Sequence, residues 1–192
     1  MVALRPEHPY VLALPRGGVP VAAAVAASLL APLEVVVARK LGAPGFPEYA
    51  LGAVAEGGVR VLNPQVESRL PLRPGELEAL TEREQAAVDR AVDRFRAGAP
   101  LPSLAGWTAV VVDDGLATGV TAEAALVAVA RLGPRRLVLA APVCASDTVD
   151  RLVASVDALV CVERPHDLRA VGLWYRDFSQ TTDDEVLALL GR

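Results

Sequence analysis

The chain has 192 residues, of which 53% are hydrophobic, and a formal net charge of −4 at pH 7. This length and apolar content are enough to bury the core of one domain, which argues against a largely disordered protein. The acidic balance, with a pI near 5.2, makes nucleic acid a poor partner, because no excess of basic side chains covers the chain.

The N-terminal third predicts a strand, a helix and a second strand, at Val11–Leu14, Pro20–Leu30 and Glu34–Ala38. Both strands are apolar without alternation, which is typical of strands buried on both faces. Residues 19–38 taken together are too interrupted for a membrane span, by Pro32 and Glu34 among others. We therefore expect a soluble protein that does not enter a membrane.

The turns after these two strands carry groups suited to an anion. Arg16 supplies a guanidinium group, and Gly17 and Gly18 leave the backbone N–H groups exposed. Arg39 and Lys40 end the second strand at the same edge of the sheet, because the carboxyl ends of parallel strands meet there. An ordinary tight turn and a pair of surface salt bridges are the plain alternatives for these residues.

Residues 41–98 interrupt the strand–helix alternation. The Gly- and Pro-rich residues 41–49 predict a flexible loop, which leads into short strands at Ala50–Val54 and Val59–Leu62. Glu48 in that loop is either a catalytic carboxylate or a solvated one. Residues 74–98 predict an amphipathic helix that covers the core or lies in a dimer interface.

The stretch Val110–Ala122, VVVDDGLATGVTA, joins a predicted strand at Val110–Asp113 to a predicted helix at Thr121–Arg131. Backbone N–H groups at the start of a helix attract anions, and a Gly/Thr turn lets a phosphate approach them closely. Asp113 and Asp114 can accept hydrogen bonds from the paired hydroxyls of a ribose. A helix N-cap that happens to follow two acidic residues is the alternative.

The last strands are predicted at Leu137–Ala141 and Ala158–Val162, on either side of a helix at Ser146–Val156. Cys144 and Cys161 lie in apolar runs without CxxC spacing, so we expect two buried, reduced thiols and a cytoplasmic protein. A terminal helix is predicted at 183–190. Strands that alternate with helices predict an α/β fold with an open, mainly parallel sheet flanked by helices.

VVVDDGLATGVTA resembles the phosphoribosyl pyrophosphate (PRPP) motif of the type I phosphoribosyltransferases, with an apolar strand, two acidic residues and a Thr-Gly-x-Thr turn. LGAPGFPEYALGAV and WYRDFSQTTDDEV resemble an uncharacterised bacterial subgroup of that family. The resemblance implies one domain over residues 1–192, with a core at about 11–162. It also implies a flexible loop at about 41–49 and a small C-terminal hood at about 163–192, and the amphipathic helix at about 74–98 would be an insertion.

The same resemblance implies a role for each candidate residue. The ribose diol would be bound by Asp113 and Asp114, and the 5′-phosphate by Ala117, Thr118, Gly119, Val120 and Thr121. Pyrophosphate would be bound by Arg16, Gly17 and Gly18, and the catalytic candidates are Arg39, Lys40 and Glu48. Mg²⁺ would be bound through the ligand, near the two aspartates, with no dedicated protein site.

The activity that the resemblance implies is transfer of a 5-phosphoribosyl group from PRPP to a nitrogen acceptor, with release of pyrophosphate, by a homodimer. The acceptor is a nucleobase or another amine, and His166 and Trp174 in the hood are the candidates for contact with a base. Ala117 stands where many purine-type members have an acidic residue, which makes a hypoxanthine- or guanine-type role doubtful. A non-catalytic sensor of PRPP or of a nucleotide is the alternative.

Overall fold

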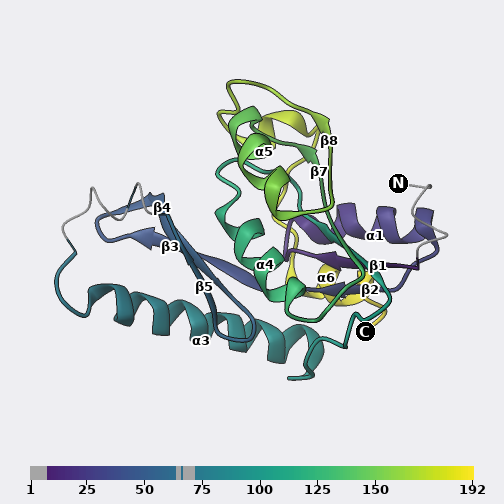
Figure 1. Cartoon of the computed structure of the whole chain (residues 1–192), viewed down its shortest axis with the longest axis horizontal. Coiled ribbons are helices and arrows are strands. Elements are labelled where there is room, and N and C mark those ends of the chain that lie inside the picture. Colours follow the sequence, from purple (N-terminus) through teal and green to yellow (C-terminus); the bar gives the residue numbers. More distant parts are fainter. Residues whose placement is uncertain (1–7, 64–65, 67–71) are drawn as a thin grey trace.

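The computed structural model describes residues 8–63, 66 and 72–192, apart from the side chains of residues 47 and 48. Its main sheet has five parallel strands in the order β2-β1-β6-β7-β8 (Figure 1). The strands are β1 (Pro9–Ala13), β2 (Leu33–Val35), β6 (Thr108–Val112), β7 (Arg136–Val143) and β8 (Ala158–Glu163). The predicted open, mainly parallel sheet is confirmed.

The central strands of the main sheet, β1, β6 and β7, are apolar at nearly every position because both faces of the sheet are covered there. Val11 and Val110 pack on one face, together with α1 (Gly18–Leu29) and α6 (Asp183–Leu189). Leu12 packs on the other face with α4 (Val120–Ala130) and α5 (Ser146–Leu152). Consecutive side chains of a strand point to opposite faces, so a strand covered on both sides loses the polar alternation.

The chain reverses its direction of travel across the sheet at β1. One βαβ unit runs from β1 through α1 to β2, and the other units run from β6 through α4 and α5 to β8. The crossover helices of the two halves lie on opposite faces, which opens a crevice between the carboxyl ends of β1 and β6. Ligands of open α/β sheets bind at this topological switch point.

A second, antiparallel sheet extends from the first, as Figure 1 shows. It contains β3 (Ala38–Ala43), β4 (Phe46–Ala55) and β5 (Val59–Leu62), and α3 (Glu76–Arg96) runs along it. The predicted strand at residues 34–38 is therefore divided between the two sheets. Residues 41–49 form the end of a hairpin, not an irregular loop, because β3 and β4 pair as far as Ala43 and Phe46. Their flexibility stays a prediction.

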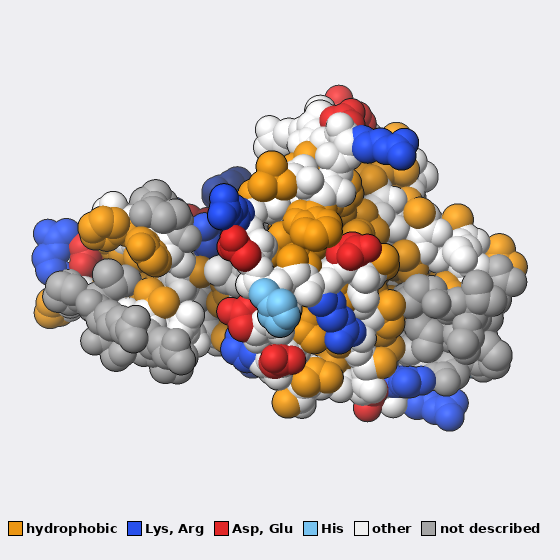
Figure 2. Space-filling view, turned by 90° about the horizontal axis from the view of Figure 1, so that it is seen from above, with side chains coloured by type: hydrophobic (Ala, Val, Ile, Leu, Met, Phe, Trp, Pro, Cys, Tyr) orange, Lys and Arg blue, Asp and Glu red, His pale blue; other side chains and the backbone are white. Residues whose placement is uncertain are grey.

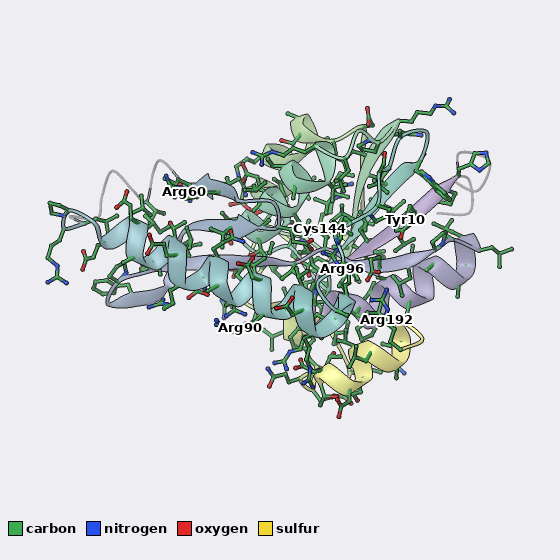
Figure 3. The ribbon with its side chains drawn as sticks, turned by 90° about the horizontal axis from the view of Figure 1, so that it is seen from below. Tyr10, Arg60, Arg90, Arg96, Cys144 and Arg192 are labelled. Carbon is green, nitrogen blue, oxygen red and sulfur yellow. A yellow bond between two sulfur atoms is a disulfide. The ribbon has the colours of Figure 1, made fainter. Side chains whose placement is uncertain are left out.

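A buried arginine fixes the C-terminal end of α3 to the main sheet. Arg96, labelled in Figure 3, is 5% exposed, pairs with Glu56 and donates a hydrogen bond to the Val35 carbonyl at 3.0 Å. Glu56 also accepts a hydrogen bond from the backbone N–H of Val37 at 2.6 Å. These bonds tie α3 to the point where the chain leaves β2 for the second sheet.

The prediction of two reduced cysteines is wrong for this structure. Cys144 and Cys161 form a disulfide, with their Cα atoms 6.3 Å apart. Cys144 follows β7, and Cys161 lies on β8 opposite Ala141, so the parallel register brings the two side chains together. The cysteines consequently lend no support to a cytoplasmic location. Among the described helices, none is long and apolar enough to cross a membrane.

Candidate active site

The two predicted anion-binding turns lie against each other at the switch point. The turn after β1 contains Arg16 and Gly17, and the peptide bond between Pro15 and Arg16 is cis. A Cβ atom on Gly17 would lie 1.8 Å from Oδ2 of Asp114, in the turn after β6. A Cβ atom on Gly18 would lie 2.8 Å from the Val112 carbonyl oxygen. Both glycines are therefore needed for the close approach of the two turns.

Asp113 and Asp114 are half-buried and are joined by a hydrogen bond. Oδ1 of Asp113 accepts a hydrogen bond from the backbone N–H of Asp114 at 2.9 Å. Burial, and then repulsion from Asp114, raise the pKa of Asp113 well above its ordinary value. Burial also raises the pKa of Asp114, against the opposing effect of its hydrogen bonds. The pair is thus an acceptor-rich site maintained at an electrostatic cost.

The turn between Asp114 and α4 has a glycine in the left-handed region immediately before the helix. Gly119 has φ +65°, in the left-handed region, and a Cβ atom there would lie 2.5 Å from Cγ2 of Thr148. Ala117 and Thr118 are exposed, and α4 begins at Val120. The first N–H groups of a helix have no partner within it, so those at Val120 and Thr121 could bind an anion at this turn.

Two side chains of α5 fix this turn, and neither was among the predicted site residues. The Thr148 hydroxyl donates a hydrogen bond to the Ala117 carbonyl, and the Arg151 guanidinium group donates one to the Thr118 carbonyl. Arg151 also pairs with Glu123 of α4. These bonds occupy the carbonyl oxygens of the turn, which would otherwise repel a phosphate. The sequence offers only an indirect signal for these two residues. The helix α5 follows β7, and β7 lies beside β6 in the sheet, so the start of α5 lies near the turn after β6.

The three predicted cations are only partly brought together. Arg16 and Arg39 line one pocket of about 410 Å³, whereas Lys40 lines a neighbouring cleft between the β3–β4 hairpin and α3. The prediction that Arg39 and Lys40 end a strand of the main sheet is wrong, since both lie near the start of β3. The reason is that β2 ends early, at Val35. The side chain of Glu48 lies outside the part that the structure describes.

A cleft of about 880 Å³ opens beside Asp114 and is closed on its other side by the C-terminal segment. Tyr175 and Phe178 line it, with ring centroids 5.0 Å apart, and the Tyr175 hydroxyl donates to the Asp114 carbonyl at 2.6 Å. Burial and the nearby aspartates raise the pKa of Tyr175 to about 12. The predicted base-contacting residues, His166 and Trp174, are exposed and are not among the residues lining this cleft.

In the face shown in Figure 2, Lys and Arg side chains are interspersed with Asp and Glu, without one continuous basic field. Within residues 8–63, 66 and 72–192, no group of three or more His, Cys, Asp or Glu side chains is placed to hold a metal ion. The two aspartates alone suit a Mg²⁺ ion bound mostly by oxygens of the ligand and by water.

The fold and this arrangement define an α/β protein with a candidate phosphosugar site at its switch point. The family model of the phosphoribosyl transferase domain matches residues 5–175. The chain therefore belongs to the phosphoribosyltransferase family, and the resemblance seen in the PRPP motif is confirmed.

Relatives agree with this assignment. A Mycobacterium tuberculosis protein named, provisionally, a phosphoribosyl transferase is 48% identical over 182 residues, which are 95% of this chain and 41% of that protein. The chain thus spans about two fifths of the length of the curated relatives that it matches. The crystal structure of TT1426 from Thermus thermophilus is 45% identical, with a TM-score of 0.78 over 98% of this chain and 90% of that one.

A more distant structural neighbour shares only the fold. The AQ2163 protein from Aquifex aeolicus is 16% identical, with a TM-score of 0.50 over 84% of this chain and 58% of that one.

Proposed function

We propose that the chain transfers a 5-phosphoribosyl group from PRPP to a nitrogen acceptor, with release of pyrophosphate. The observation that carries the proposal is the contact of Asp114 with Gly17, which joins a diol-binding turn to an anion-binding turn at the switch point. A ribose on Asp113 and Asp114 would place its 5′-phosphate at the turn before α4 and its pyrophosphate toward Arg16. These are the three groups that PRPP carries.

In this reaction the C1–O bond of PRPP breaks and its electron pair leaves with pyrophosphate, while the acceptor nitrogen bonds to C1 and loses a proton. Positive charge develops on the ribose ring, as in glycoside hydrolysis. The aspartates fix the diol and place negative charge near that ring, and Arg16 stabilises the departing anion. Mg²⁺, when bound by PRPP near Asp113 and Asp114, would neutralise further charge on the pyrophosphate.

A nucleobase is the proposed acceptor because the cleft beside Asp114 contains an aromatic pair. Tyr175 and Phe178 offer flat apolar faces in a cleft of about 880 Å³, on which a heterocycle could stack. The hydroxyl of Tyr175 is held by the Asp114 carbonyl, which fixes the ring relative to the proposed ribose site. The homodimer and the cytoplasmic location stay predictions.

The direct test is pyrophosphate release from PRPP and Mg²⁺ across a panel of purine and pyrimidine bases and simple amines. We expect release with at least one base, and no release when Mg²⁺ is chelated. Saturable binding of PRPP without release under any acceptor would reject catalysis with this panel and support the sensor. Release with an amine alone would replace the nucleobase in the proposal.

A second test concerns the side chain that holds the phosphate turn. Thr148→Val keeps the shape of a side chain that is 4% exposed but removes the hydroxyl bonded to the Ala117 carbonyl. We expect the KM for PRPP to rise about 3- to 10-fold, because a neutral hydrogen bond contributes about 0.5–1.5 kcal/mol. The measurement is steady-state pyrophosphate release, with the base saturating.

Thr81→Val is the matched control. The Thr81 hydroxyl also donates to a backbone carbonyl, that of Leu77 at 2.7 Å, but on α3 and away from the turn. Both variants are expected to lose some thermal stability, whereas only Thr148→Val changes the KM for PRPP. Equal KM values in the two variants would show that Thr148 does not position the turn.

A further inference from the structure

Arginines of α3 line the pocket next to the proposed pyrophosphate site. The pocket of about 410 Å³ is lined by Arg16 and Arg39 and also by Arg90 and Arg94, one helical turn apart on α3. Figure 3 views the molecule from the side of α3 and labels Arg90 on it. Residues four apart on a helix lie on the same face, so both guanidinium groups are presented to one ligand.

One carboxylate holds two of these arginines together. Oδ1 of Asp183 lies 3.3 Å from Nη1 of Arg16, and its Oδ2 lies 3.3 Å from Nε of Arg94. A phosphate group offers guanidinium groups the same paired oxygens as a carboxylate, so the two groups compete for the same donors. Asp183 thus marks where an anion fits between the turn after β1 and α3.

The charges around the pocket favour an anion. Four guanidinium groups line it, and among its described lining residues the carboxylate is that of Asp183. Arg39 also pairs with Glu84 at 3.0 Å, and Arg94 reaches the exposed Asp184 at 3.5 Å. Within the described residues, no ion pair occupies Arg90. Four guanidinium groups against these three carboxylates leave one positive charge in excess, which favours an anionic ligand.

The pocket adjoins the proposed PRPP site, and this position suggests which anion it binds. Arg16 lines both this pocket and the cleft that contains Asp114, so the two cavities meet at its side chain. The anchoring of Arg96 to Val35 and Glu56 fixes the end of α3 that carries Arg90 and Arg94. We infer that Arg90 and Arg94 bind the pyrophosphate of PRPP, and that Asp183 holds Arg16 and Arg94 until pyrophosphate displaces it. This inference rests on the proposed function.

The experiment is calorimetric titration of the full chain with inorganic pyrophosphate and Mg²⁺. Arg90→Gln and Arg94→Gln should each weaken binding about 10-fold or more, the effect of losing a hydrogen bond between charged groups. Asp183→Asn should strengthen binding several-fold, because a competing carboxylate is removed. Arg90, Arg94 and Asp183 lie at the surface, so thermal unfolding should confirm that all three variants fold.

Arg60→Gln is the matched control, since it removes one positive charge from an exposed position on β5 that lines neither cavity. The inference would be overturned if Arg90→Gln and Arg94→Gln both bound pyrophosphate as tightly as Arg60→Gln does. It would also be overturned if the wild-type chain did not bind pyrophosphate. Base-dependent turnover measured in parallel separates the two proposals. Turnover without an effect of Arg90 or Arg94 rejects only the inference, and the expected binding pattern without turnover rejects only the transfer reaction.

Discussion

Replacing both carboxylates, by Asp113→Asn and Asp114→Asn together, is expected to slow transfer by orders of magnitude while making the fold more stable. Each aspartate is proposed to accept a charge-assisted hydrogen bond from the ribose diol, and such bonds contribute about 1.5–3 kcal/mol. Losing two of them should lower kcat/KM about 10²- to 10⁴-fold. Pyrophosphate release at limiting PRPP measures this loss.

The gain in stability follows from the raised pKa values of the pair. A carboxyl with a raised pKa binds its proton more tightly in the folded state than in the unfolded state. The free energy of unfolding therefore falls as the pH rises above the unfolded value of about 4 and through the folded pKa. Neutral Asn avoids this penalty, so the Tm of the variant should exceed that of the wild type at pH 7 but not at pH 3.

The gain is measured as the difference in Tm between the variant and the wild type, at pH 7 and at pH 3. Glu78→Gln with Glu82→Gln is the control, since it removes two exposed carboxylates of α3 and changes the net charge equally. It should alter neither kcat/KM nor the pH dependence of Tm. The electrostatic account is contradicted if the Tm of the double aspartate variant minus the Tm of the wild type is smaller at pH 7 than at pH 3.

The main sheet and the positions of the two turns after β1 and β6 were predictable because their signals are local. Val110–Val112 and the Asp-Asp-Gly turn after it fall within one short stretch, and the apolar runs place the other strands. Right-handed crossovers limit the face on which each helix can lie, but they do not set the order β2-β1-β6-β7-β8. Boundaries shifted by only a residue or two in α1 and α4, where the caps decide the ends.

Features that depend on tertiary contacts could not be predicted in this way. Residues 41–49 are rich in Gly and Pro, yet they complete a hairpin because β3 pairs with β4. The disulfide depends on the register of β7 with β8, which sets Ala141 beside Cys161. A single sequence does not encode either pairing in any short motif.

The site residues that sequence reasoning missed share the same cause. Thr148 and Arg151 reach the phosphate turn from a helix about 30 positions away in the chain. Arg90 and Arg94 lie on the polar face of an amphipathic helix, where charged residues are ordinary. Only tertiary contacts, in the pocket beside Arg16 and in the bonds from α5 to the turn before α4, distinguish them from solvated side chains.

Gly17→Ala should cost catalysis far more than stability, because the added methyl group meets a side chain that can move. Gly17 has φ −60°, which alanine adopts without strain, but its Cβ would lie 1.8 Å from Oδ2 of Asp114. The carboxylate must rotate away and so leaves the proposed diol site. A displacement of about 1 Å in a positioning group costs about 10²-fold in rate, and we expect that loss in kcat/KM.

Gly18→Ala provides the matched comparison, since the same methyl group there meets backbone. Its Cβ would lie 2.8 Å from the Val112 carbonyl oxygen and 3.0 Å from Cα of Asp113, and neither can rotate away. Overpacking of this kind costs about 1–3 kcal/mol, so Gly18→Ala should lower Tm by several degrees. Tm and kcat/KM measured for both variants separate the two effects. If Gly17→Ala keeps the wild-type kcat/KM, the position of the Asp114 carboxylate does not matter for catalysis. The close approach of the two turns would then have another role.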